Sequence, residues 1–319
     1  MFLSGRKTVL VIVLLAVARM ASAQQDPLFS QYMYNDLYNN PAYSGVMGVT
    51  NLSMMYRSQW VGYTGTFDDG GAPQTFYAGF NTPIYRARSG AGFYFVNDIL
   101  GPQNNLQFMG SYAYHLGIGA GKLSIGVRAG IYGQSIDFGK YNPVNPDDPI
   151  LLNGKESQYR PDMGVGLYYK TEKYYAGISL NHLLNSSFDF NTDSLKNALV
   201  KNMVLTGGYR YELNYDVVLN PSLLVRTDFI SYSFDVSLLG TYREKFWGGL
   251  SYRQSEAVVA LLGMNMLKDK SLKVGFSFDY IIQAQKAKQA TSVELLVSYN
   301  MPAVTGGGKK IIRTPRFRH

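Results

Sequence analysis

The sequence predicts an all-β protein, a transmembrane antiparallel up-and-down β-barrel of about 14 strands. Three observations lead to this prediction. Apolar residues alternate with small or polar residues in runs of about ten. No segment after residue 23 offers the ~18 consecutive apolar residues that a transmembrane helix needs. The chain also begins with the features of an export signal.

The alternation is clearest near the C-terminus, where Leu272, Val274, Phe276, Phe278 and Tyr280 are separated by Lys, Gly, Ser and Asp. A tilted strand needs about ten residues to cross a membrane, whereas strands of soluble sandwiches are usually nearer five or six. The length of the runs therefore favours a membrane barrel over a soluble sandwich. Similar alternation occurs in residues 123–134, 232–243 and 293–299.

Fourteen segments follow this pattern, an even number, as expected of a single-chain bacterial barrel. Tyrosines gather near the ends of many of them, where the aromatic girdles of a membrane barrel lie. The expected strands are residues 49–58, 74–82, 90–97, 105–116, 122–134, 162–170, 174–182, 202–213, 215–227, 231–243, 246–254, 256–267, 271–283 and 291–300.

The lengths of the connections provide an independent check on this assignment. If both termini lie in the periplasm, the long connections 59–73, 135–161 and 183–201 all fall on the outer side of the membrane. Long outer loops and short inner turns are characteristic of such barrels. The expected periplasmic connections are short, among them 171–173, 214, 244–245 and 268–270.

The N-terminus reads as a secretory signal peptide spanning residues 1–23. Arg6 and Lys7 precede an apolar run at 9–18, and Ala21 and Ala23 supply the small residues of a cleavage site. The alternative, a retained anchor helix, is disfavoured because the run is about half the length of a membrane span. The sequence contains no cysteine, so the exported chain has no disulfide framework. We expect an outer-membrane protein.

Charged residues on the faces opposite the apolar positions would be costly in a soluble core but can line a barrel lumen. We predict that six of them face the lumen, namely Arg128, Arg210, Asp235, Arg243, Lys273 and Asp279.

The formal net charge is +8, and removal of the signal peptide with its three basic residues leaves about +5. Nucleic acid is an unexpected partner for an exported protein. The segment 301–319 is expected to be a basic periplasmic tail, which would meet an acidic protein surface, lipid headgroups or the cell wall, or would simply be solvated. Its basic residues are Lys309, Lys310, Arg313, Arg316 and Arg318.

The segment 24–48 lies between the signal peptide and the expected barrel, 49–300. Its aromatic residues suggest that it packs, either as a plug in the lumen or at the periplasmic rim. An ordinary periplasmic lead-in is the alternative. We predict that Phe29, Tyr32 and Tyr34, together with the basic tail, contact a partner.

Five blocks of sequence carry a resemblance to a known family. Residues 26–35 read D-P-L-F-S-Q-Y-M-Y-N, and residues 39–45 read N-N-P-A-Y-S-G. R-S-Q-W follows at 57–60, G-F-Y-F-V-N-D at 92–98 and P-D-M-G-V-G-L-Y-Y at 161–169. These blocks resemble the PorP/SprF family of the type IX secretion system, whose members typically open with D-P-x-F-S-Q-Y-M-x-N and N-P-A-x-x-G.

The resemblance extends from residue 24 to about residue 301 and implies a barrel that serves type IX secretion or gliding. Some relatives help to export or anchor an adhesin at the cell surface, and others associate with the lipoproteins of the periplasmic ring. The resemblance implies no catalytic residues and no cofactor. The basic tail matches no family motif, so its role stays open.

Two further functions remain as alternatives. An outer-membrane diffusion channel for small solutes or fatty acids is supported by the polar, mainly basic lumen, which would favour anions. An outer-membrane hydrolase would need a catalytic group. The sequence has no G-x-S-x-G motif, and His115, His182 and His319 lack the spacing of metal ligands.

Overall fold

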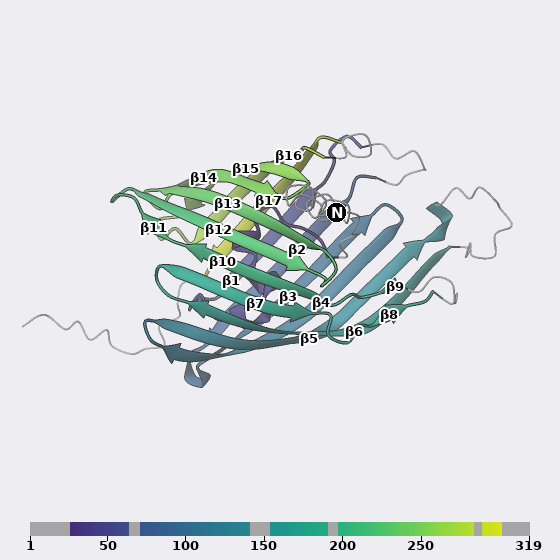
Figure 1. Cartoon of the computed structure of the whole chain (residues 1–319), viewed down its shortest axis with the longest axis horizontal. Helices are drawn as coiled ribbons and strands as arrows, with labels where there is room; N and C mark the ends of the chain where they lie inside the picture. The colour runs from purple at the N-terminus through teal and green to yellow at the C-terminus, as the bar shows by residue number, and fades with distance from the viewer. Residues whose placement is uncertain (1–25, 64–70, 141–153, 191–196, 284–288, 302–319) are drawn as a thin grey trace, which may run out of the picture.

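The computed structural model describes residues 26–63, 71–140, 154–190, 197–283 and 289–301. Its strands form one closed antiparallel barrel, shown in Figure 1. The short strand β11 continues β10 after one residue, so the wall consists of fourteen strands, as the sequence predicts. Among the described residues, no helix is long and apolar enough to span a membrane.

Every predicted strand is present. The wall strands are β1 (Asn51–Ser58), β2 (Gln74–Ile84), β3 (Ser89–Leu100), β4 (Gln103–Ile118), β5 (Gly121–Asp137), β6 (Lys155–Lys170), β7 (Tyr174–Asn181), β10 (Asn202–Tyr209) with β11 (Tyr211–Glu212), β12 (Val217–Thr227), β13 (Tyr232–Tyr242), β14 (Phe246–Arg253), β15 (Ala257–Met266), β16 (Leu272–Ile281) and β17 (Thr291–Asn300).

The first and last strands close the ring. Asn51 of β1 lies opposite Asn300 of β17, and the two strands pair along the whole of β1. On the other side of the barrel β10 pairs with β7 and β12, because the connection between β7 and β10 forms a separate small hairpin. Its strands are β8 (Ser187–Phe188) and β9 (Asn197–Ala198).

One boundary differs substantially from the prediction: β6 begins at Lys155, seven residues earlier than expected. The additional residues, such as Ser157 and Gln158, are polar on both faces of the strand. A search for apolar alternation passes over such an extension. The connection between β5 and β6 is correspondingly shorter than expected.

The two ends of the barrel differ, and we name them after their connections. The loop end carries the long connections 59–73, 138–154 and 182–201, and the turn end carries short ones such as 119–120, 171–173 and 243–245. All the long connections therefore lie on one side, as predicted.

The outward face of the wall is apolar. On β13, Val236 and Leu238 are exposed, whereas Asp235 and Ser237 between them are buried on the inner face. Exposed apolar side chains on membrane-crossing strands contact lipid. The alternation read from the sequence thus separates the lipid face from the lumen face.

The segment 26–48 lies inside the barrel, where its purple ribbon is enclosed by the strands in Figure 1. It contains three short helical turns, η1 (Tyr32–Tyr34), α2 (Asp36–Asn39) and η2 (Pro41–Tyr43). Asn40 caps the last turn by accepting a hydrogen bond from the Ala42 N–H at 2.9 Å. Pro at the first position of that turn is favourable because its fixed φ suits a helical turn and it has no N–H to satisfy.

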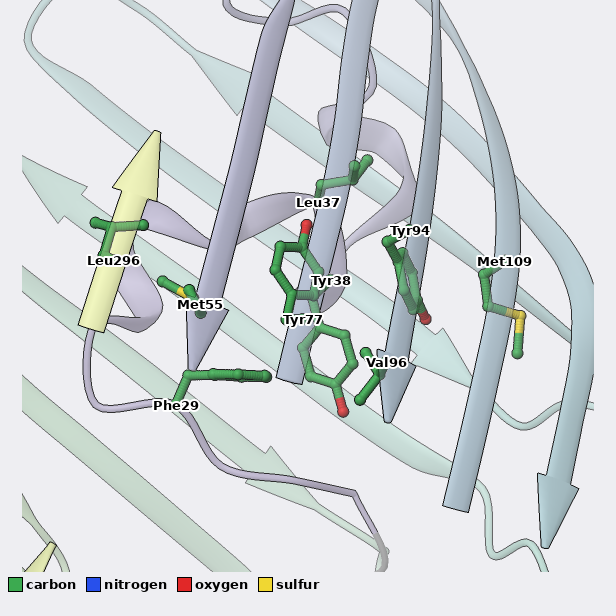
Figure 2. Close-up of a cluster of buried hydrophobic side chains, with 9 residues drawn as sticks. All are labelled: Phe29, Leu37, Tyr38, Met55, Tyr77, Tyr94, Val96, Met109 and Leu296. Atoms are coloured by element: carbon green, nitrogen blue, oxygen red, sulfur yellow. The ribbon is translucent and has the colours of Figure 1, made fainter. Parts of the chain in front are cut away.

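Figure 2 shows how this segment packs against the wall. Phe29 and Tyr38 contact each other edge-to-face, with ring centroids 5.3 Å apart, and both rings meet Tyr77 of β2. Tyr38 also meets Tyr94 of β3 at 5.4 Å. Apolar side chains complete the cluster, namely Leu37, Met55, Val96, Met109 and Leu296.

Candidate functional site

The carboxylate of Glu294 on β17 holds the start of the lumen segment. It accepts hydrogen bonds from the backbone N–H of Ser30 at 2.7 Å and of Gln31 at 2.9 Å. Glu294 is fully buried. A buried carboxylate is stable only where donors or cations compensate its lost hydration, and here two backbone amides do so.

Arginine side chains extend this anchor across the lumen. Arg57 of β1 binds Asp279 of β16 at 2.7 Å and lies 3.5 Å from Glu294. Arg253 of β14 binds Asp235 of β13 at 2.7 Å and donates to the carbonyl oxygen of Phe29 at 3.1 Å. All of these charged side chains are almost completely buried.

Ser30 joins the two halves of this network. Its hydroxyl donates to Asp279 at 2.6 Å and accepts from Arg57. Four strands are thereby linked through one serine and its neighbouring backbone. Removing one partner of a buried ion pair typically costs ~3–5 kcal/mol, so the network strongly favours the seated position of the segment.

A second anchor holds Asp26, the first residue that the structure describes. Asp26 receives a hydrogen bond from Asn202 at 2.6 Å and pairs with His182, whose other ring nitrogen lies 2.8 Å from Asp162. Burial alone would raise the pKa of the Asp26 carboxyl, but the His182 charge and the hydrogen bonds from His182 and Asn202 outweigh burial and lower the pKa to about 2. Asp26 is therefore ionised at neutral pH.

Glycines in the wall make room for the second half of the segment. A Cβ on Gly126 of β5 would lie 2.4 Å from backbone atoms of Ala42, and a Cβ on Gly90 of β3 would lie 2.4 Å from the Cα of Gly45. Gly45 itself has φ +74°, a backbone conformation that favours glycine. The N-P-A-Y-S-G block thus fits against a wall that lacks side chains at these points.

Between the segment and the turn end lies a cavity of about 910 Å³, which we call the vestibule. Met33 and Tyr34 of the segment line it on one side. Its wall carries six basic side chains, at Lys122, Lys170, Lys173, Arg210, Lys270 and Lys273, against two acidic ones, at Glu172 and Glu244.

One face of the vestibule is aromatic. The ammonium nitrogen of Lys273 lies 3.8 Å from the ring centroid of Tyr34 and 5.8 Å from that of Trp247. The two rings are 4.9 Å apart. The indole N–H of Trp247 is buried and has no hydrogen-bond partner among the described residues.

The structure places the six predicted lumen residues in two groups. Arg128, Asp235, Lys273 and Asp279 lie on the inner face of the wall, and Arg128 donates to the carbonyl oxygen of Tyr38 at 2.9 Å. Arg210 and Arg243 lie at the turn end with more exposed side chains, where they pair with Glu212 and Asp216.

The predicted partner-contact residues are also separated. Phe29 and Tyr32 are buried within the lumen, and the Tyr32 hydroxyl lies 3.1 Å from that of Ser222. Tyr34 borders the vestibule. The tail residues Lys309, Lys310, Arg313, Arg316 and Arg318 lie outside the described residues, as does the predicted signal peptide.

Sequence reasoning missed most of the anchoring residues. Glu294 and Arg253 were not singled out, although Glu294 alternates with the apolar face of β17 and so belongs to the lumen face. Arg57 and Asp162 lie in motifs that suggested the family, but those motifs did not indicate that the two side chains make buried contacts in the lumen. An isolated charge on the lumen face of a strand was the available signal.

These observations define an outer-membrane β-barrel whose lumen is occupied by its own N-terminal segment. The family model described as type IX secretion system membrane protein PorP/SprF matches residues 21–299, and the chain belongs to this family. The resemblance recognised in the sequence is thereby confirmed, and the protein is located in the outer membrane.

Solved structures of other outer-membrane barrels are similar at low identity. A FadL homologue from Pseudomonas aeruginosa is 13% identical, with a TM-score of 0.44, over 82% of this chain and 93% of that chain. Acinetobacter baumannii Omp33 is 8% identical, with a TM-score of 0.43, over 81% and 100%. The CymD monoaromatic hydrocarbon channel is 13% identical, with a TM-score of 0.48, over 84% and 92%. Curated proteins provide no match.

Proposed function

We propose that this protein is a non-enzymatic component of the type IX secretion or gliding machinery that works by binding other proteins. The expected partners are a secreted adhesin-like surface protein, the lipoproteins of the periplasmic ring, or both. The observation that carries this proposal is the occupied lumen. Residues 26–48 contact strands on every side of the barrel and are held by buried charges.

An occupied lumen leaves the two ends of the barrel as the places where proteins can be contacted. The loop end carries long connections, and the turn end carries the vestibule and the last described residues before the basic tail. With the turn end in the periplasm, the vestibule and the tail would face the ring, and the loops would face the cell surface.

A binding role without catalysis also fits the surroundings of His182, one of two buried histidines among the described residues. Both ring nitrogens of His182 are engaged, one by Asp162 and the other by Asp26. In hydrolysis a histidine usually activates the nucleophile by taking its proton. Neither nitrogen of His182 is free for this role. Among the described residues, no group of three or more acidic or histidine side chains is arranged to hold a metal ion.

The vestibule supports a second candidate, a diffusion channel for small solutes or fatty acids. Its volume of about 910 Å³ lies within the usual range of ligand pockets. Passage from the vestibule to the loop end would require the lumen segment to move. That movement would break the buried contacts of Glu294 and Arg253, which weighs against free diffusion.

A pull-down in mild detergent tests the proposal. The tagged full-length protein is isolated from its native membrane, and the proteins that accompany it are identified by mass spectrometry. An unrelated outer-membrane barrel carrying the same tag is the control. Enrichment of a secreted surface protein or of ring lipoproteins is expected. A partner-free protein that conducts ions steadily in planar bilayers would replace the proposal with the channel.

A further inference from the structure

We propose that the vestibule is a binding site for an acidic, extended peptide segment of a partner protein, entering from the turn end. This inference rests on the proposed function, because it names the chemistry of one partner contact. Three features of the vestibule support it: its charge, the distribution of that charge around the barrel, and its aromatic face.

The positive charge of the vestibule is only partly compensated. Lys270 is paired with Glu244 at 2.6 Å and Arg210 with Glu212 at 3.4 Å, and Lys170 interacts with the charge of Asp36. By contrast, none of the ion pairs formed between described residues includes Lys122, Lys173 or Lys273. Several unpaired cations lining one cavity create a positive potential that attracts anions and excludes cationic chains. The basic C-terminal tail of the protein itself is therefore an unsuitable occupant.

The charges are distributed around the cavity rather than gathered at one point. Lys170 lies on β6 and Lys273 on β16, which are seven strands apart in either direction around the fourteen-stranded ring. A circular barrel with strands about 4.8 Å apart and tilted by about 40° is roughly 28 Å across between opposite backbones. A single phosphate or carboxylate cannot reach both sides, whereas a chain with several carboxylates can.

The aromatic face suits a polypeptide that also carries apolar groups. Tyr34 and Trp247 border the cavity, where their rings offer apolar surface to a bound chain. Peptide recognition commonly combines charge with aromatic contacts in this way.

Lipid is a less suitable source of the anion. The vestibule lies inside the barrel, and the lipid-facing side chains point away from it on the opposite faces of the same strands. An anionic headgroup would have to leave the bilayer to enter the lumen. A soluble acidic chain in the compartment at the turn end reaches the mouth directly.

Fluorescence of Trp247 provides a direct binding test in the full-length protein. The sequence has two tryptophans, so Trp60→Phe leaves Trp247 as the single reporter. In a mild detergent at low salt, the protein is titrated with a peptide of alternating Glu and Gly that contains one Phe. The same peptide with Gln in place of Glu is the control, and inorganic phosphate and phosphatidylglycerol micelles are titrated separately.

We expect saturable binding of the Glu peptide, weakened at least tenfold by 300 mM salt and absent with the Gln peptide. Lys173→Gln with Lys273→Gln should weaken it at least tenfold. Because Lys273 packs on Tyr34, a second variant, Lys122→Gln with Lys173→Gln, changes only exposed side chains and should weaken binding severalfold. Lys140→Gln with Lys155→Gln removes two positive charges at the loop end and should leave affinity unchanged.

Equal affinity of all variants for the Glu peptide would overturn the inference. So would tight binding of phosphatidylglycerol or phosphate that depends on the same lysines and displaces the peptide. The pull-down described above separates this failure from that of the proposed function. If the lysine variants bind peptide normally while native partners still co-purify, only the vestibule site is wrong.

Discussion

The Glu294 carboxylate accepts a hydrogen bond from the backbone N–H of Ser30 at 2.7 Å, and 264 residues separate the two in sequence. This contact joins the first described segment of the chain to the strand that closes the barrel. The lumen segment can therefore be fully seated only when the C-terminal strand is in place.

Glu294→Gln should loosen the lumen segment without preventing barrel formation. The amide keeps a single acceptor oxygen for the two backbone N–H groups and no longer balances the buried guanidinium of Arg57, so stability should fall by about 3 kcal/mol. The temperature at which the folded barrel changes its mobility in SDS gels measures this loss. Glu212→Gln, at an exposed carboxylate of the turn end, should leave that temperature unchanged. If both variants change their mobility at the same temperature, Glu294 does not anchor the lumen segment.

Gly126→Val should displace the second half of the segment, because its Cβ would lie 2.4 Å from backbone atoms of Ala42. The cysteine-free chain allows a single reporter cysteine at buried Val46. With Val46→Cys, labelling by a water-soluble maleimide should be at least tenfold faster in the Gly126→Val protein. Gly110→Val is the matched control, since the nearest atom to its Cβ is 3.8 Å away. Slow labelling in both proteins would mean that the segment does not depend on this close approach.

The pH dependence of stability should reflect Asp36 in the lumen segment. Burial raises the pKa of this carboxyl to about 7, although the charge of Lys170 and a hydrogen bond from Tyr168 oppose the shift. A carboxyl with a raised folded-state pKa stabilises the fold below its unfolded pKa near 3.8, and this contribution is lost as the pH rises through about 7. Between pH 5 and pH 8 the loss is roughly 2–3 kcal/mol.

Asp36→Asn tests this dependence, because asparagine resembles the protonated carboxyl at every pH. The native protein should lose more stability than the variant between pH 5 and pH 8 when thermal transitions are compared at the two values. His182, whose pKa is raised to about 10 by Asp26 and Asp162 despite the opposing effect of burial, contributes equally to both proteins. Parallel pH profiles for the two proteins would contradict the assignment to Asp36.

Deletion of residues 306–319 should weaken association with periplasmic partners while leaving the barrel folded. The reason is electrostatic, because five basic residues of the segment would be removed. Co-purification of ring proteins before and after deletion measures the effect. A full-length variant with those five residues changed to Gln separates charge from length. Unchanged co-purification in both variants would show that the tail is not a contact.

Local alternation was enough to predict the wall of the barrel. The lipid face and the lumen face of a strand differ at every second residue, so β13 and β16 could be read without knowing their neighbours. The same rule missed the first residues of β6, where both faces are polar. The N-terminal blocks indicated the family for a different reason, since they are distinctive as sequence.

Only the tertiary structure decided what the lumen holds. Alternation predicts that Arg128 and Asp279 face inward, but it cannot identify their partners, because those lie on distant strands or in the lumen segment. The vestibule likewise depends on closure of the ring, which brings Lys170 and Lys273 to one cavity although about a hundred residues separate them in the sequence. The sequence by itself determined a membrane barrel and its family; closure of fourteen strands around a folded-in segment determined its anchors and its basic cavity.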